Sequence, residues 1–313
     1  MSSSVLNTIS NSSYSVTGAN AVAIAPSGES FLYVASTSGG ITLYSIGSNG
    51  ALAAGVNFNS DTQARALAVD PTGKWLLDAS GSGNLNAYPI TSAGALDTTR
   101  QTQTQPLAST AIEQGQITIS SSPEIVAVAL GSIGTQVFNF SSQTLQPGIT
   151  PLKPTGTAAL SVATDPLSRF LYIGETGTTA SSGGLRVFKI SSTGGLTELN
   201  ASNPSSSGGV APNFILPLAS GHYVYVANGN GAGSAGNVTG FAVSASGISS
   251  GTTVATGDQP QGLAEDSTAA WVFEVNSSSN PSFDAYTIGT GGQLASQFTS
   301  TSAAPSMAIV AAP

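Results

Sequence analysis

The chain has 313 residues, of which 7% are charged and 40% are hydrophobic, and its formal net charge is −8. Its seven cations are scattered along the sequence, which excludes the basic stripe needed to bind nucleic acid or an anionic membrane surface. The absence of cysteine excludes disulfides, thiol catalysis and cysteine-ligated metals.

The sequence contains no apolar run approaching the roughly 18 residues of a membrane-spanning helix. Its start, MSSSVLNTIS, lacks the basic and apolar regions of a signal peptide. The charge-poor, polar composition nevertheless favours an extracytoplasmic protein, periplasmic or secreted, and we expect a monomer.

In chain order, residues 5–10 (VLNTIS) resemble the last strand of a repeat, and six copies of a four-strand unit follow. The first strands are predicted at 21–26, 66–71, 116–121, 160–166, 213–218 and 261–266. The second strands are predicted at 31–36, 75–80, 125–130, 170–175, 223–228 and 271–276. The third strands are predicted at 41–46, 84–90, 135–140, 185–190, 238–243 and 282–288. The fourth strands are predicted at 50–55, 94–99, 143–148, 194–199, 247–252 and 291–296.

The second strands are variants of one motif, from FLYVAS at 31–36 through FLYIGE at 170–175 to YVYVAN at 223–228. Short segments rich in aromatic and β-branched residues, bounded by turns such as PTGKW, are typical of strands. The third strands repeat an aromatic anchor at Tyr44, Tyr88, Phe138, Phe188, Phe241 and Tyr286. A four-strand repeat of about 48 residues has the length of a β-propeller blade.

We therefore predict an all-β chain that forms a single propeller of four-stranded antiparallel blades over 1–313. The blades are expected at about 20–64, 65–114, 115–157, 158–209, 210–259 and 260–303. Residues 305–313 (PSMAIVAAP) read as one more first strand, so 1–19 and 304–313 together predict an incomplete seventh, closing blade. A six-bladed ring with two extra strands is the alternative.

The recurring pattern of an alternating strand, a Pro-x-Gly turn, an FLYVA-like strand and a Tyr or Phe strand resembles the bacterial lactonase-type seven-bladed propellers. These are similar to the YVTN repeat proteins. The resemblance covers residues 5–313 and includes 6-phosphogluconolactonase, so it implies a hydrolase acting on a sugar-acid lactone. The repeats themselves are structural, and many relatives are surface-associated or secreted proteins of unknown substrate.

We expect the first strands to line a central channel, with ligand contacts where the chain enters strand one or leaves strand two. Charged or amide residues at these positions are the candidate site, in two groups. The catalytic candidates are Glu175 and Arg65, and the ligand-binding candidates are Asn20, Asn213, Asn228, Gln261 and Asn276.

Glu175 occupies a position that is neutral in the other copies, and a carboxylate there can act as general base on a water that attacks a lactone. Arg65 can hold a substrate carboxylate or phosphate through two hydrogen bonds. The alternative is that Glu175 pairs with a neighbouring cation. No cofactor is expected, although a divalent cation bound by Glu175, Asn213 and Asn228 is an alternative.

Asp78 and Glu274 stand inside second strands at a position that is apolar in the other copies. They predict either perturbed pKa values or partly exposed, hydrogen-bonded carboxylates, and the second interpretation is favoured.

Two functions fit these observations. One is hydrolysis of a sugar-acid lactone by base-activated water. The other is a non-catalytic extracytoplasmic propeller that binds a small carbohydrate or lactone or serves as a surface scaffold. Convergence of Glu175, Arg65, Asn213 and Asn228 on one pocket would favour the enzyme.

Overall fold

The structure is a computed structural model of the whole chain. It describes residues 14–25, 30–37, 39–58, 61–97, 100, 102–113, 116–177, 183–199, 205–230, 235–249, 251–277, 282–300 and 309. These residues contain strands and turns, and no helix occurs among them. Consistently, this described part contains no helix that is long and apolar enough to cross a membrane.

The strands form six antiparallel sheets, each ordered from the inside of the ring to its rim. Blade 1 comprises β1 (Ala19–Ile24), β2 (Phe31–Ser36), β3 (Gly40–Ser45) and β4 (Val56–Phe58). Blade 2 comprises β5 (Ala64–Val69), β6 (Trp75–Ser80), β7 (Asn84–Pro89) and β8 (Gln103–Pro106). Blade 3 comprises β9 (Ile117–Ile119), β10 (Ile125–Ala129), β11 (Thr135–Ser141) and β12 (Thr144–Leu145).

The last three blades follow the same plan, with an extra pairing at the rim of blades 4 and 5. Blade 4 comprises β13 (Ala158–Thr164), β14 (Phe170–Thr176), β15 (Gly183–Ile190), β16 (Leu196–Glu198) and β17 (Ser205–Ser206). Blade 5 comprises β18 (Ala211–Pro217), β19 (Tyr223–Gly229), β20 (Ala235–Ser244), β21 (Gly247–Ile248) and β22 (Thr252–Asp258). Blade 6 comprises β23 (Pro260–Glu265), β24 (Trp271–Asn276), β25 (Phe283–Ile288) and β26 (Leu294–Ser300).

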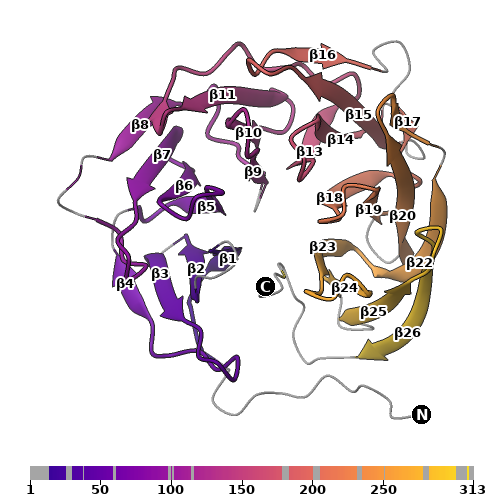
Figure 1. Cartoon of the computed structure of the whole chain (residues 1–313), viewed down its shortest axis with the longest axis horizontal. Helices are drawn as coiled ribbons and strands as arrows, with labels where there is room; N and C mark the ends of the chain where they lie inside the picture. Colours follow the sequence, from indigo (N-terminus) through magenta and orange to yellow (C-terminus); the bar gives the residue numbers. More distant parts are fainter. Residues whose placement is uncertain are drawn as a thin grey trace.

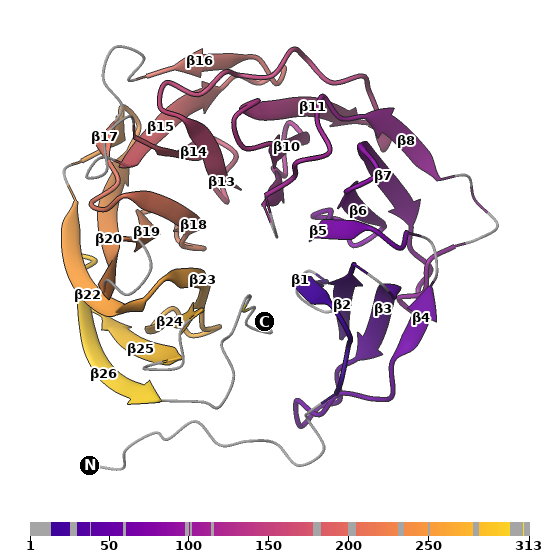
Figure 2. The ribbon, with the colours of Figure 1, turned by 180° about the vertical axis from the view of Figure 1, so that it is seen from behind.

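The blades are arranged around a common centre, as Figure 1 shows, and the view from behind in Figure 2 confirms the ring. The innermost strands β1, β5, β9, β13, β18 and β23 contact one another in that order. The predicted all-β propeller of four-stranded blades is therefore confirmed. The predicted closing blade falls on residues that lie outside the described ones, apart from residues 14–19 and 309.

The hydrophobic core lies between the blades. Five clusters of buried residues were found among the described residues, and each combines side chains of two neighbouring blades. The predicted aromatic anchors of the third strands are all buried in these layers or beside them. Burial of apolar surface, at roughly 25 cal/mol per Å², therefore stabilises the ring rather than each blade separately.

The turn between the first two strands of blade 2 shows how the sequence fixes the inner hairpin. Gly73 has a φ of +70°, which favours glycine. The Asp70 carboxylate accepts hydrogen bonds from the backbone N–H of Lys74 at 2.8 Å and of Trp75 at 2.6 Å. The predicted PTGKW turn is thus closed by a side chain that precedes it.

The predicted fourth strands of the first two blades are wrong. Leu52 and Leu96 each form a single bridge with the end of the third strand, to Ile46 and Ile90. The fourth strands proper begin later, at Val56 and Gln103. The repeated Gly-Ala-Leu motif makes the turn, and less regular residues make the outer strand.

Candidate functional site

A β-bulge interrupts most of the innermost strands where the chain enters the blade. The register shifts there, so one residue stands outside the regular pairing. The bulge residues are Asn20, Arg65, Leu160, Asn213 and Gln261. Four of the predicted site residues therefore occupy equivalent positions on the strands that surround the centre of the ring (Figure 1). Bulges commonly re-aim side chains next to functional sites.

Two of these bulge residues connect neighbouring blades. Asn20 Nδ2 donates to the carbonyl oxygen of Ala64 at 3.0 Å, and Asn213 Nδ2 donates to that of Pro260 at 2.9 Å. Each acceptor is the residue just before the bulge of the next blade. These amides thus hold adjacent innermost strands together.

The other two polar bulge residues, Arg65 and Gln261, are freer. Gln261 is partly exposed and its amide bonds locally to the carbonyl oxygen of Gln259 at 3.3 Å. Arg65 is exposed, and among the described residues its guanidinium belongs to none of the ion pairs. Arg65 is therefore the bulge residue best able to contact an anionic group from solution.

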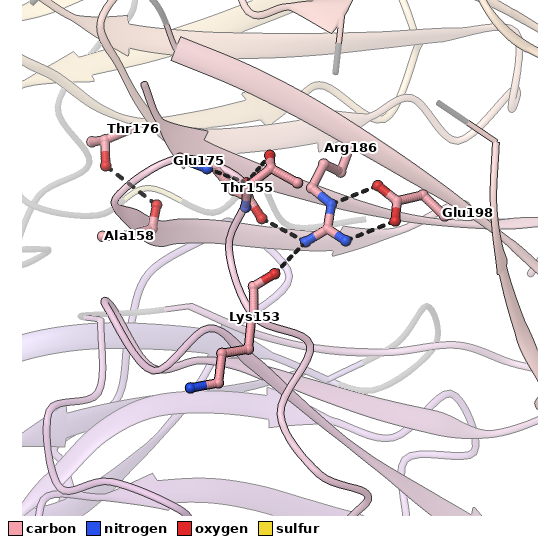
Figure 3. Close-up of polar contacts among 8 residues, drawn as sticks. Lys153, Thr155, Ala158, Glu175, Thr176, Arg186 and Glu198 are labelled. Carbon is pink, nitrogen blue, oxygen red and sulfur yellow. Dashed lines mark hydrogen bonds and ion pairs between the residues drawn. The ribbon is translucent and has the colours of Figure 1, made fainter. Parts of the chain in front are cut away.

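Glu175, at the end of β14, is buried in a network of charged and polar groups (Figure 3). Its Oε1 accepts a hydrogen bond from Arg186 Nη1 at 2.8 Å. Its Oε2 accepts from the backbone N and the Oγ1 of Thr155, both at 2.8 Å, and from the backbone N of Gly156 at 3.3 Å. Both oxygens are already hydrogen-bonded, as in a structural ion pair.

Arg186 was not singled out in the sequence, yet it organises this network. It binds Glu198 through Nε at 2.7 Å and Nη2 at 2.8 Å, and it donates to the carbonyl oxygen of Lys153 at 2.8 Å. Burial would lower the pKa of Arg186, but hydrogen bonds to Glu198 and Glu175 raise it. The sequence did contain a signal for Arg186, because the equivalent position of the third strand carries a polar residue in every blade. These residues are Thr42, Asn86, Gln136, Arg186, Thr239 and Asp284.

Asn228 is the last residue but one of β19, Asn276 is the last residue of β24, and both are fully buried. Asn228 Nδ2 donates to the carbonyl oxygen of Ser207 at 2.7 Å and to Asn237 Oδ1 at 3.0 Å. Asn276 Nδ2 donates to two carboxylates of its own blade. The Asn276 amide thus bonds within its own blade, whereas the Asn228 amide also bonds to the segment that follows β17 of blade 4.

The predicted catalytic and binding residues thus belong to separate hydrogen-bond networks. Glu175 bonds within blade 4 and the segment before it, and Asn213 bonds to blade 6. Asn228 bonds within blade 5 and to Ser207, which follows β17 of blade 4. The structure also contains no group of three or more His, Cys, Asp or Glu residues poised for a metal, as far as the described residues go.

A polar pocket of about 320 Å³ lies in blade 1, where the chain enters β1 and leaves β2. This is the face on which we expected a ligand, but the pocket lies beside the outer strands rather than in the channel. The lining residues are Ser15, Val16, Thr17, Ser36, Gly39, Thr42, Tyr44, Gly55 and Asn57. None of these nine residues is charged.

Asp78 and Glu274 are completely buried, contrary to the favoured prediction of partial exposure. The pKa of Asp78 is raised well above its usual range, first by burial and then by the hydrogen bond and the negative charge of Asp61. The pKa of Glu274 is likewise raised to about 9, first by burial and then by the hydrogen bond and the negative charge of Asp284. Both pKa shifts come first from burial and then from a second carboxyl group, which disfavours the ionised form where a cation would have favoured it.

Comparison with known families gives one match, to the family described as "Lactonase, 7-bladed beta-propeller", over residues 3–280. No curated protein matches the chain.

Solved structures show the same fold at low sequence identity. A Lactobacillus plantarum protein is 20% identical with a TM-score of 0.66, over 93% of this chain and 86% of that one. A Bacteroides uniformis protein described as a candidate 6-phosphogluconolactonase is 16% identical with a TM-score of 0.61, over 89% and 85%. Hydrazine synthase of Kuenenia stuttgartiensis is 14% identical with a TM-score of 0.63, over 86% and 76%. Such different proteins share the fold, so the fold alone does not assign an activity.

Proposed function

We propose that this chain, which belongs to the family of seven-bladed lactonase propellers, binds a small, uncharged polar ligand of the carbohydrate or sugar-lactone class. The binding site of this proposal is the pocket of blade 1. The observation that carries the proposal is the chemistry of its lining, which combines hydroxyl groups, an amide and a tyrosine ring without any charge.

The size and chemistry of the pocket suit such a ligand. A volume of about 320 Å³ lies at the small end of the range of ligand pockets, which is about 300–1,000 Å³. Ser36, Thr42 and Asn57 contribute hydroxyl and amide groups to the lining. Ser36 Oγ already donates to the carbonyl oxygen of Thr17 at 2.5 Å and Asn57 Nδ2 to Thr42 Oγ1 at 3.2 Å, so a sugar hydroxyl would use the acceptor positions that remain on these groups. Tyr44 adds an apolar ring wall, and Tyr14 packs against it with ring centroids 5.2 Å apart. A charged ligand would gain no ion pair from these lining residues.

The same lining favours binding over hydrolysis. Activation of water requires a base such as a carboxylate or an imidazole within hydrogen-bond reach, and the lining residues include neither. None of the lining residues could therefore activate a water to open a lactone bound in this pocket.

Lactone hydrolysis at the channel is the second candidate, and the family match supports it. Here Arg65 would bind the substrate, Glu175 would act as base, and Asn20, Asn213 and Gln261 would contact the ligand. The exposure of Arg65 supports this role. The four hydrogen bonds accepted by Glu175 oppose it, because they would have to be released before a water could be activated.

Ligand-detected NMR with a panel of monosaccharides and aldonolactones tests the proposal. Asn57→Ala is expected to lose binding. Thr104→Ala is the matched control. Thr104 pairs with the third strand of blade 2 at the position where Asn57 pairs with that of blade 1, and it lies outside the pocket. Equal binding by both variants would contradict the proposed pocket.

Hydrolysis is measured in parallel by pH-stat on the same lactones, with Glu175→Gln and Arg65→Gln. Binding without turnover above background supports the binding role. Turnover that either substitution abolishes would establish the second candidate instead.

A further inference from the structure

A second cleft lies toward the rim of the ring, between blades 5 and 6, where β22 contacts β25 and β26 (Figure 1). It has a volume of about 240 Å³ and is lined by Tyr225, Gly240, Thr252, Thr253, Val254, Gly292, Gln293 and Leu294. None of these residues belongs to an innermost strand or to the pocket of blade 1. The cleft is therefore separate from both candidate sites described above.

Gly240 leaves a side-chain position of the repeat empty at this cleft. In blades 1, 4 and 5 the second strand carries a tyrosine that pairs with a residue of the third strand. The pairs are Tyr33 with Leu43, Tyr172 with Val187, and Tyr225 with Gly240. Leu43 and Val187 are buried hydrophobic residues, so of these three blades only blade 5 lacks an apolar side chain at this position.

The boundary between blades 1 and 2 shows what fills the equivalent space elsewhere. Leu96 has in blade 2 the place of Leu294 in blade 6, because each pairs with the isoleucine at the end of the third strand and follows a glycine of positive φ by two residues. Leu43 and Leu96 belong to one buried cluster. Leu294 is only partly buried. The cleft is therefore a place where one aliphatic side chain is missing from an otherwise repeated packing.

The lining combines apolar walls with a polar mouth. Val254 and Leu294 are partly buried and pack against the apolar cluster between blades 5 and 6. Thr252 and Gln293 are exposed at the opening, where a hydroxyl and an amide can bond to one polar group of a ligand. None of the lining residues is charged, and no Lys or Arg follows Lys189 in the chain. An anionic ligand would therefore find no counter-charge here.

We propose that this cleft binds a small, uncharged aromatic molecule of the phenol or indole class. Its ring takes the place of the missing side chain, against Val254 and Leu294, and its polar group points to Thr252 and Gln293. An apolar cavity of about 150 Å³ is enough to take up benzene, so a cleft of about 240 Å³ accommodates one substituted ring. A sugar fits less well, because aliphatic walls would desolvate its hydroxyl groups without offering them partners.

The test uses the full chain with methyl groups of Leu and Val labelled for NMR, titrated with p-cresol and with indole. Saturable binding is expected with a Kd on the order of 1 mM or tighter, as for a ligand of this size. The methyl signals of Val254 and Leu294 should shift, and those of Leu96 should not. The anion p-hydroxybenzoate should bind at least about fivefold more weakly than p-cresol, because the lining holds no cation.

Two substitutions probe the cleft itself. Gly240→Leu restores the tyrosine–leucine pair of blade 1 and should weaken p-cresol binding at least about tenfold, because the new side chain occupies the space. Leu294→Ala removes one wall and should weaken binding about fivefold. Leu196→Ala is the matched control: Leu196 has the same place after the third strand of blade 4, is also partly buried, and lies outside the cleft, so binding should be unchanged.

Three results would overturn the proposal: no saturable binding of either ring compound, methyl shifts that leave out Val254 and Leu294, or an equal loss of binding in Leu294→Ala and Leu196→Ala. A Cβ at Gly240 would lie 2.6 Å from Tyr225 Cε1, so Gly240→Leu requires the tyrosine ring to move. If that variant fails to fold, the methyl shifts of the wild type and the two leucine variants still decide the outcome.

Discussion

The hydroxyl of Tyr225 donates a 2.8 Å hydrogen bond to the carbonyl oxygen of Gly292, which belongs to the next blade. Tyr33 makes the equivalent bond to Gly94 at 2.7 Å. Both acceptors are glycines with positive φ, at +76° and +78°, in the turn after the third strand. The tyrosine of the repeated second strand therefore fastens one blade to the following one.

Tyr225→Phe should lower the free energy of unfolding by about 1–2 kcal/mol, because it leaves the Gly292 carbonyl without its buried donor. Tyr172→Phe is the matched control. Tyr172 occupies the same position in blade 4, but its buried hydroxyl has no partner among the described residues, so its removal should be neutral or stabilising. Urea unfolding measures both, and an equal loss in the two variants would contradict the role of the inter-blade bond.

Arg186→Met should destabilise the protein by about 3–5 kcal/mol, because Glu175 and Glu198 would lose their buried counter-charge. Arg65→Met removes an exposed guanidinium and should change stability by less than about 0.5 kcal/mol. The shift in the midpoint of urea unfolding decides this prediction. A small effect of Arg186→Met would show that Glu175 is easily freed, which would favour its role as a base.

Asn20→Ala should destabilise the ring by about 1 kcal/mol, since its amide donates to Ala64 in the neighbouring blade. Gln261→Ala, at the equivalent bulge, should have little effect because its amide bonds locally. The comparison is made by thermal unfolding without ligand. If both variants retain wild-type stability, the bulge amides are free for ligands rather than used between blades.

The sequence predicted the inner part of each blade better than its rim. The first three strands carry recurring apolar residues and aromatic anchors because they pack between blades, so their positions follow from the pattern. The outer strands face solvent, as exposed Val56 of β4 illustrates, and no burial constrains their residues. That freedom is why the predicted fourth strands of blades 1 and 2 were placed too early.

The site was harder to predict for a related reason. An unusual charge in a repeat position identified Glu175, Asp78 and Glu274, but a repeat pattern does not reveal the partner of each. In blade 4, Arg186 of β15 lies directly across from Ile173 of β14. In blade 6, Asp284 of β25 lies directly across from Glu274 of β24. Whether a buried acid meets an arginine or another acid depends on cross-strand register, which sequence spacing alone left open.

The pH dependence of stability tests the uncompensated acid of blade 6. The pKa of Glu274 rises from its usual 4.5 to about 9 on folding, because burial and Asp284 disfavour its ionised form. Between these values the folded state holds a proton that the unfolded state has released. The free energy of unfolding should therefore fall as pH rises from about 5 to 9, by about 1.4 kcal/mol per pH unit from this group.

Glu274→Gln keeps the shape of the side chain and removes the titration, so it should flatten this slope in urea unfolding series. Asp78→Asn should also make the fall of stability with pH less steep, since the pKa of Asp78 is raised too, first by burial and then by Asp61. A slope that Glu274→Gln leaves unchanged would show that Glu274 does not take up a proton on folding.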